Sequence, residues 1–351
     1  MKLLFVGENW QGSSARSMRE ALAALPGIEV QDISEDLYKP AWRSKLLRVA
    51  ARLIGPALRQ ELGTLIRRTV EVNRPDALVV YKGWAVGLHT VRSVASTGIL
   101  TVNIFPDLSP TFHGSRLRDA MGAYDLVIST KPFHPDMWIG TFGYKNLCVC
   151  VPHGYDPAVH LLPLPNDNAT FDVLLVATWR PQYEELMRQV ARQLLCDGIV
   201  VNIVGNGWES AKASLPTNCL VGPAVSGRAY AALLHRARIV IAPLHPSNNE
   251  LQIGDVDTTR TYELAAANCF FLHRRTSFVQ TIYDERTEVP MWDDADELVR
   301  LIRRFLPNEA TRRDMATAAH ARAVPAYSIP SRAREVAAHI QAVMMKRNHA
   351  K

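Results

Sequence analysis

Short apolar runs alternate with longer amphipathic stretches along the first half of the chain. The amphipathic stretches are long enough to form crossover helices, and the apolar runs are continuous, as strands buried on both faces are. The pattern therefore predicts a parallel sheet with helices on both faces. Its predicted strands are residues 2–6, 28–33, 77–82, 99–103, 126–129 and 147–151.

The alternation stops at Pro152-His-Gly-Tyr-Asp-Pro157 and resumes after a stretch rich in proline and asparagine that reads as a linker. With 351 residues, the chain has room for two domains of about 150 residues each. We predict an α/β protein with two Rossmann-like, doubly wound domains facing each other across a cleft. The expected parts are an N-terminal domain at 1–157, a linker at 158–170, a C-terminal domain at 171–326 and a helix at 327–351 that crosses back to the first domain. The strands expected in the second domain are 173–177, 200–204, 219–221, 239–242 and 269–272.

Composition favours a globular cytoplasmic protein. Hydrophobic residues make up 48% of the chain, yet no apolar run reaches the ~20 residues that span a bilayer. The N-terminus reads as a first buried strand, because its short apolar run lacks a small-residue cleavage site. The five cysteines are an odd, scattered set that suits reduced thiols, and Cys148-x-Cys150 has the wrong spacing for a zinc site.

The net charge of +6 is unevenly distributed. Lysine and arginine are concentrated between residues 39 and 74, where apolar residues recur at helical spacing and only Glu61 and Glu71 are acidic. This segment predicts a basic amphipathic helix, or a helix pair interrupted at Gly55-Pro56. Two interpretations remain open: the solvated outer face of a packed helix, or a face for an acidic acceptor or for anionic lipid at the inner side of a membrane. Nucleic acid is excluded as a partner, since no aromatic stacking set accompanies the charges.

The segment from Asp255 to Leu272 carries the most chemistry. Thr258, Thr259 and Arg260 stand at a predicted helix start, where free amides and the helix dipole suit a diphosphate. Glu263 falls one turn further on, where its carboxylate can accept hydrogen bonds from a ribose diol. The alternative interpretation is an ordinary helix cap followed by a favourable first-turn charge.

Loops after other predicted strands offer further places for an anionic ligand. Gly12 lies after the first strand, in a loop that lacks the G-x-G-x-x-G spacing of nicotinamide and flavin enzymes. Arg180 can pair with a diphosphate, or alternatively with Glu184 or Glu185. Gly205 and Gly207 would let a base or ribose lie against bare backbone, although a tight turn also accounts for them.

With these elements in this order, the chain resembles the retaining glycosyltransferases of the GT-B fold, group 1 (family 4-like), and most closely the spore-maturation (CgeB-like) group. Pro152-His-Gly-Tyr-Asp156 stands where that superfamily has its hinge motif. Asp255 and Glu263 match its two carboxylates separated by seven residues, and the run from Arg260 to Leu272 resembles the group's signature of arginine, aromatic residue, glutamate, small-residue helix and buried strand. The resemblance covers roughly residues 75–335.

The resemblance implies a sugar nucleotide bound mainly by the second domain and an acceptor held by the first. Glu263 would bind the ribose, whereas Arg180, Thr258, Thr259 and Arg260 would hold the diphosphate. Asp255 would lie near the sugar, and Asp107 and His113 are the candidates to touch the sugar or the acceptor hydroxyl. The chain departs from the family pattern in two ways: no lysine stands in the few residues after Arg180, and the first carboxylate is aspartate instead of glutamate.

We therefore expect transfer of a hexose-like sugar, with retention, from a nucleoside diphosphate donor to a hydroxyl of a glycan or lipid-linked acceptor. Asp255-Val-Asp257 spells the D-x-D of a metal-using fold, but the architecture predicts no metal and no cofactor, because arginines and a helix end meet the diphosphate charge. Two alternatives remain: a non-catalytic nucleotide-sugar or glycan-binding partner in surface-polysaccharide assembly, and a GT-B-type epimerase.

Overall fold

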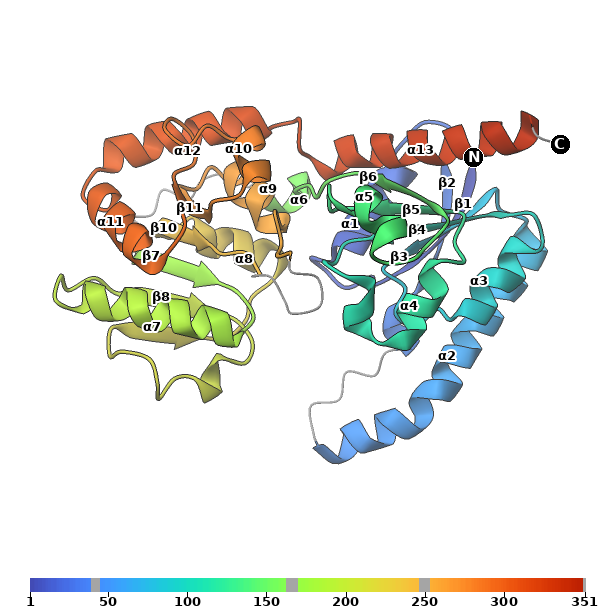
Figure 1. The fold of residues 1–351 in the computed structure, drawn as a ribbon, viewed down its shortest axis with the longest axis horizontal. Helices are drawn as coiled ribbons and strands as arrows, with labels where there is room; N and C mark the ends of the chain where they lie inside the picture. Colours follow the sequence, from blue (N-terminus) through green and yellow to red (C-terminus); the bar gives the residue numbers. More distant parts are fainter. Residues whose placement is uncertain (39–44, 162–169, 246–252, 350–351) are drawn as a thin grey trace. The chain divides into compact units, whose positions relative to one another are not determined.

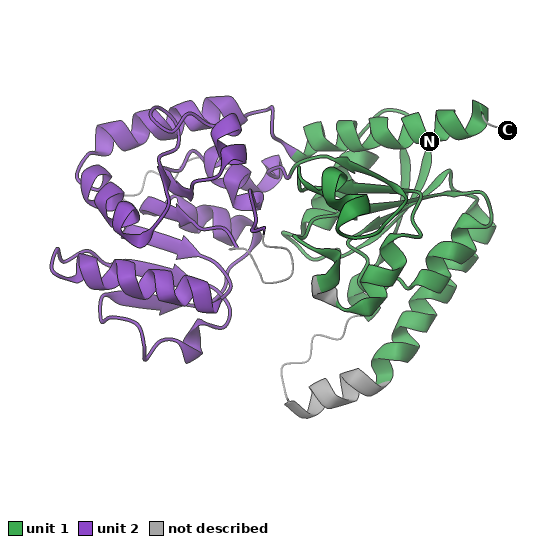
Figure 2. Ribbon diagram, in the orientation of Figure 1, with its two compact units in different colours: residues 1–152, 329–351 green, residues 153–328 purple. Residues whose placement is uncertain are grey.

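The computed structural model describes residues 1–38, 45–161, 170–245 and 253–349, with side chains omitted for 45–53 and 112–113. The chain forms two compact units (Figure 2). Met1–Pro152 and Ile329–Lys351 make the first unit, and His153–Ser328 make the second. The predicted divisions were 1–157, 171–326 and 327–351.

The first unit is built on a six-stranded sheet in the order β2-β1-β3-β4-β5-β6, with every neighbouring pair parallel. Each apolar run predicted in this half forms a strand. The strand order reverses between β1 and β3, which is where open sheets of this kind bind ligands. The strands are β1 (Lys2–Gly7), β2 (Glu29–Ser34), β3 (Ala77–Tyr81), β4 (Leu100–Phe105), β5 (Leu126–Ser129) and β6 (Leu147–Cys150).

Helices cover both faces of this sheet (Figure 1). Leu3 and Phe5 of β1 pack with one set of helices, and the alternate residues Leu4 and Val6 pack with the other, because successive side chains of a strand point to opposite faces. The first set is α1 (Ser14–Ala23) and α13 (Ile329–His349), and the second is α2 (Lys45–Asn73), α3 (Leu88–Ala95), α4 (Ser115–Met121) and α5 (His134–Gly140). Two short 3-10 helices, η1 (Glu35–Tyr38) and η2 (Pro110–His113), complete the unit.

The basic segment forms one helix, α2, and not a pair interrupted at Gly55-Pro56. Proline lacks an N–H and removes one helical hydrogen bond, but its fixed φ is compatible with the helix, which continues through Pro56. Leu62, Ile66 and Val70 bury one face of α2 against the sheet. The side chains of the more basic N-terminal part lie outside the description, so the expected membrane or acceptor contact stays a prediction.

The second unit contains a parallel six-stranded sheet in the order β12-β11-β10-β7-β8-β9. Its order reverses between β7 and β10, since β8 and β9 lie on one side of β7 and the later strands on the other. The predicted α/β fold with two Rossmann-like sheets is confirmed. The strands are β7 (Phe171–Val176), β8 (Val201–Val204), β9 (Cys219–Gly222), β10 (Ala237–Ala242), β11 (Phe271–Arg274) and β12 (Met291–Trp292).

Two layers of helices enclose this second sheet (Figure 1). One core cluster joins α7 (Pro181–Leu195) and α11 (Ala295–Phe305) to one face, and another joins α8 (Gly227–Leu234), α9 (Thr259–Ala266), α10 (Ser277–Ile282) and α12 (Glu309–Ala323) to the opposite face. A 3-10 helix, η3, spans Trp208–Ser210. The short helix α6 (Pro157–His160) occupies the start of the predicted linker, and residues 162–169 of that linker lie outside the description.

The chain passes between the units twice, and the two passages are hydrogen-bonded on the side of the second unit. Tyr155 and Ser328 form an isolated parallel bridge, and the Tyr155 N–H donates to the Tyr327 carbonyl at 3.1 Å. Beyond Ser328, α13 returns to the first unit, where Ala333, Val336 and Ile340 are buried in the same cluster as Leu3. The last helix is therefore a structural part of the first unit.

Each unit contains one fully buried histidine. His134 Nε2 lies 2.9 Å from the Leu108 carbonyl, and Nδ1 lies 2.6 Å from Ser129 Oγ. His273 Nδ1 lies 2.7 Å from the Arg274 carbonyl, and Nε2 lies 2.9 Å from Thr261 Oγ1. Because a carbonyl only accepts, each neutral ring donates to it and accepts from the hydroxyl with its other nitrogen. Burial lowers the pKa of both histidines to about 4.

We predict that acid destabilises both units through these rings. The unfolded histidine gains its proton near pH 6.5 and the folded one only near pH 4. Stability is therefore complete above pH 6.5, falls as the pH drops toward 4 and levels off below it, by about 3 kcal/mol per histidine. Denaturant titrations at several pH values measure this loss. His273→Gln should remove its share of the pH dependence, and an unchanged profile in that variant would contradict the assignment.

Candidate functional site

The donor-binding residues predicted in the second half gather at one edge of the second sheet. Arg180 follows β7, Gly205 and Gly207 follow β8, and Asp255 and α9 follow β10. All these strands are parallel, so their carboxyl ends meet at the same edge. The strand order reverses within this set, between β7 and β10.

Arg260 lies at that point of reversal. Its Nη1 donates to the carbonyl of Val176, which ends β7, at 2.8 Å, and its Nη2 donates to the carbonyl of Pro243, just after β10, at 3.3 Å. The guanidinium therefore fastens the start of α9 to the two central strands. It also leaves a positive charge at the carboxyl edge, because no carboxylate among the described residues pairs with it.

The start of α9 is held by a chain of hydrogen bonds. The Thr258 N–H donates to Thr261 Oγ1 at 3.0 Å, and the Thr261 hydroxyl donates in turn to the buried ring of His273 at 2.9 Å. The amide of Thr258, predicted for a diphosphate, is thus engaged within the protein. Thr259 and Arg260 provide the following amides of the helix start, and their role toward a ligand stays a prediction.

Glu263 lies one turn into α9, with 17% of its side chain exposed. Its Oε1 is 3.9 Å from Nε2 of His160, a buried residue of α6. Tyr230 of α8 lies on the same side: burial, and after it the Glu263 carboxylate, raise the pKa of Tyr230 well above its ordinary value. Its hydroxyl therefore keeps its proton at neutral pH and remains a donor.

The two aspartates of the D-x-D string differ in their surroundings. Asp257 is fully buried and accepts a hydrogen bond from the Tyr262 hydroxyl at 2.8 Å, so its carboxylate supports α9 from within. Asp255 is half-buried, and its N–H donates to the His245 carbonyl at 2.9 Å. A contact between Asp255 and a sugar ring stays a prediction. The described residues contain no group of three or more histidine, cysteine or acidic side chains placed to hold a metal ion.

Arg180 is exposed at the residue that precedes α7. Its two possible carboxylate partners have other hydrogen bonds. Glu184 accepts from the Trp179 indole at 2.7 Å and from the Ser214 hydroxyl at 2.6 Å, and Glu185 accepts from Gln189. Within the described parts of the chain no ion pair holds Arg180, so its guanidinium can reach an anion at the carboxyl edge.

The local backbone explains why glycine occupies positions 205 and 207. A Cβ on Gly205 would lie 1.9 Å from the Ala177 carbonyl oxygen, because the ends of β7 and β8 approach closely there. Gly207 has a φ of +84°, which favours glycine. The internal geometry thus accounts for both glycines, and packing of a base or ribose on them stays a prediction.

In the first unit, residues from separate loops meet at the carboxyl edge. Lys82 Nζ, just after β3, lies 2.8 Å from Asp107 Oδ2, after β4. Burial, followed by the charge of Asp107, raises the pKa of Tyr81 beside them. Gly12 lies in the loop after β1 with a φ of +95°. His113 ends η2, but its side chain lies outside the described residues, so its predicted role is untested.

Sequence reasoning did not single out Lys82, His160 or Tyr230 as site residues. Lys82 had a usable signal, since Lys82-Gly83 directly follows a buried strand, where ligand-binding loops begin. His160 and Tyr230 had none, because their proximity to Glu263 depends on how α6 and α8 pack against α9.

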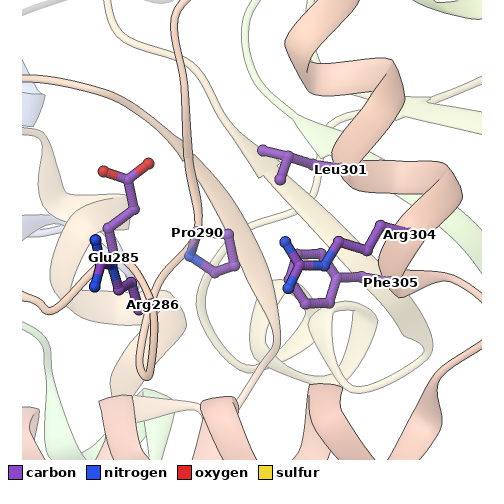
Figure 3. Close-up of a pocket in the computed structure, with 6 residues that line it drawn as sticks. All are labelled: Glu285, Arg286, Pro290, Leu301, Arg304 and Phe305. Atoms are coloured by element: carbon purple, nitrogen blue, oxygen red, sulfur yellow. The ribbon is translucent and has the colours of Figure 1, made fainter.

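A hollow of about 600 Å³ lies elsewhere on the second unit (Figure 3). Glu285 and Arg286 stand on one side of it and Arg304 and Phe305 on another, with Pro290 between them. Pro290 precedes β12, so this hollow is at the amino edge of the sheet, opposite the edge that carries Arg180 and Arg260. It is therefore not part of the candidate site.

Comparison with known proteins finds one family model and a set of solved structures similar to this chain. A family model described as glycosyl transferase-like matches residues 180–338, which include α9 and its neighbours. No curated protein matches the sequence. Among the described residues, no helix is both long and apolar enough to cross a membrane.

Solved structures show the fold. A sucrose-phosphate synthase from Thermosynechococcus elongatus matches with a TM-score of 0.68 and 12% identity, covering 99% of this chain and 100% of that one. HepE from Anabaena, in complex with UDP-glucose, has a TM-score of 0.67 and 14% identity over 97% and 100%. The chain has a GT-B-type fold. A putative UDP-N-acetylglucosamine 2-epimerase from Listeria monocytogenes also matches, with a TM-score of 0.59 and 11% identity over 98% and 97%, so the fold alone does not decide the reaction.

We predict that Gly205→Ala destabilises the second unit by about 3 kcal/mol, because its methyl group would overlap the Ala177 carbonyl. Gly222→Ala is the matched control, since its Cβ would meet the nearest atom, Val204 Cγ2, only at 3.4 Å. Denaturant unfolding measures both variants. Equal stabilities would show that the ends of β7 and β8 are not closely packed.

We predict that replacing Arg260 lowers the stability of the protein more than replacing Arg180. Arg260→Ala removes two charged hydrogen bonds to strand carbonyls and should cost about 2 kcal/mol. Arg180→Ala, at an exposed position, should change stability by less than about 0.5 kcal/mol. Denaturant unfolding midpoints of the two variants test this prediction. A larger loss of stability for Arg180→Ala than for Arg260→Ala would contradict it.

Proposed function

We propose that this protein is a glycosyltransferase that moves a hexose-like sugar, with retention, from a nucleoside diphosphate to a hydroxyl of a glycan or lipid-linked acceptor. The observation that carries the proposal is the grouping of Arg180, Arg260 and Glu263 at the point where the strand order of the second sheet reverses. The region matched by the glycosyl transferase-like model contains all three residues. The UDP-glucose bound to HepE, a protein of the same fold, supports a sugar nucleotide as the ligand class.

The charges suit such a donor. A nucleoside diphosphate leaves readily once its developing negative charge is stabilised, and a preorganised donor can contribute about 3 kcal/mol toward that. Arg180 is exposed and has no ion pair within the described chain, and it directly precedes α7. Arg260 lies in the first turn of α9 and is fixed by two carbonyls. Glu263 would accept hydrogen bonds from the ribose diol. These groups would bind the donor without a metal ion.

The proposed transfer breaks the bond between the anomeric carbon and the phosphate oxygen and forms a bond from that carbon to the acceptor oxygen. The acceptor proton passes to the departing phosphate oxygen, so no protein nucleophile is required. Asp255 would contact the sugar hydroxyls. Asp107, paired with Lys82 in the first unit, would act on the sugar or the acceptor hydroxyl.

Ligand binding tests the donor site. We expect one of UDP, GDP, ADP and TDP to stabilise the protein by about 3 kcal/mol at a hundredfold excess over its Kd, measured by thermal shift and calorimetry. Glu263→Ala should weaken that ligand at least about tenfold without changing the fold, because the ribose hydroxyls lose a charged acceptor. Glu263→Gln, which keeps the size of the side chain, is the matched control with an intermediate loss. Near-normal affinity of Glu263→Ala would remove the ribose assignment.

Turnover separates the transferase from its alternatives. Slow release of the nucleoside diphosphate from one sugar nucleotide, without acceptor, is expected of a transferase. A change in the sugar with the nucleotide still attached, seen by NMR, would indicate an epimerase. Binding without turnover, with any of a panel of acceptors, would indicate a non-catalytic partner. Retention is read from the anomeric configuration of the glycoside formed.

A further inference from the structure

The short helix α6 carries a polar side chain into the interior of the second unit. It begins right after the chain enters that unit, and Asp156 caps it by accepting a hydrogen bond from the Ala158 N–H at 2.9 Å. α6 packs against both α8 and α9. Its last residue, His160, is only 5% exposed and meets the ring of Tyr230 edge-on at a centroid distance of 6.0 Å.

The ring of His160 has one engaged nitrogen and one that lacks a partner. Nδ1 lies 3.2 Å from the Asp156 amide nitrogen and 3.0 Å from the Asp156 carbonyl, which already accepts from the amides of Val159 and His160. Nε2 is buried and has no hydrogen bond to any residue in the described ranges, and it lies 3.9 Å from Oε1 of Glu263. Because a carboxylate only accepts, the ring form with a proton on Nε2 is the favoured one beside it.

Tyr230 presents a second donor to the same carboxylate. Its hydroxyl is buried and makes no hydrogen bond of normal geometry to a described residue. Burial, and after it the nearby Glu263 carboxylate, raise the pKa of Tyr230. His160 Nε2 and the Tyr230 hydroxyl are thus two buried donors beside one acceptor, the Glu263 carboxylate. Buried donors usually have hydrogen-bond partners, because leaving one unpaired is unfavourable. A small movement of the Glu263 side chain would bring its carboxylate into hydrogen bonds with both donors.

We propose that His160 and Tyr230 are positioning residues that hold the Glu263 carboxylate in place when a ribose diol binds it. A carboxylate offers about four lone-pair positions. The ribose would use those that face the ligand, and the His160 N–H and Tyr230 O–H would use those that face the protein. The inference rests on the proposed ribose-binding role of Glu263. It adds that α6, at the start of the second unit, contributes to nucleotide affinity through Glu263.

Paired ligands test the proposal, because the positioning residues act only through the diol. For whichever of UDP, GDP and ADP binds best, the affinity of the full-length protein is measured by calorimetry, together with that of its 2′,3′-dideoxy counterpart. His160→Leu and Tyr230→Phe should each weaken the ribose form about fivefold and leave the dideoxy form unchanged. His160→Gln should restore most of the affinity, because its amide nitrogen can take the place of Nε2.

Controls distinguish positioning from packing. A merely structural role would weaken both ligands equally and would lower the melting temperature, whereas Tyr230→Phe removes a single oxygen and should still fold. In a Glu263→Ala background, His160→Leu should have no further effect on the ribose form. Equal losses for both ligands, or unchanged affinity for the ribose form, would overturn the proposal.

The same measurements show which proposal has failed. If the wild-type protein prefers the ribose form, and only Glu263→Ala abolishes that preference, the ribose site stands and the role of His160 and Tyr230 is refuted. If the wild-type protein binds both forms equally, or binds no nucleotide, the ribose site itself is refuted, and the inference falls with it.

Discussion

The architecture of the candidate site depends on one attachment, the partly buried guanidinium of Arg260 hydrogen-bonded to the carbonyls of Val176 and Pro243. Parallel strands leave unpaired carbonyls at their carboxyl ends. Where the strand order reverses, the connections leave toward opposite faces of the sheet, and a crevice opens between them. An arginine is suited to this position because its planar fork can satisfy two carbonyls while its charge stays at the edge. Through that attachment the helix bearing Glu263 is fixed to the two central strands.

The groups behind Arg260 form a graded environment. In the interior, Tyr262 is hydrogen-bonded to Asp257 and Thr261 to His273, and these pairs support the helix start. One layer outward, Glu263, His160 and Tyr230 are largely buried but incompletely bonded. Outermost is Arg180, which is exposed. The inner groups are hydrogen-bonded to one another, and the outer ones keep free hydrogen-bonding positions. This arrangement suits the proposed anion and diol site, since a ligand would provide the bonds that the protein leaves open.

The sequence was sufficient for the fold because runs such as residues 3–6 in β1 and Ala77–Tyr81 in β3 are continuous and apolar, as buried parallel strands are. It missed β12, because a two-residue strand has no periodicity. At Gly55-Pro56 it left open one helix or a pair, and the single helix α2 is the one that forms. In the site, Arg180, Arg260 and Glu263 could be found because each stands directly after a predicted strand or inside a motif. Gly205 was ambiguous, since only coordinates show the Ala177 carbonyl beneath it. His160 could not be found, because a contact between α6 and α9 brings together residues over a hundred positions apart.

The bridge between Tyr155 and Ser328 has a consequence for how such chains diversify. Because both ends of the second unit emerge side by side, that unit is topologically a cassette spliced into the first one, between β6 and α13. An inserted domain whose two termini lie side by side can be replaced as a whole without moving the strands and helices of the domain that contains it. Recombination at this double junction would join a given first unit to a new second unit in a single event, and α13 would still pack against α1.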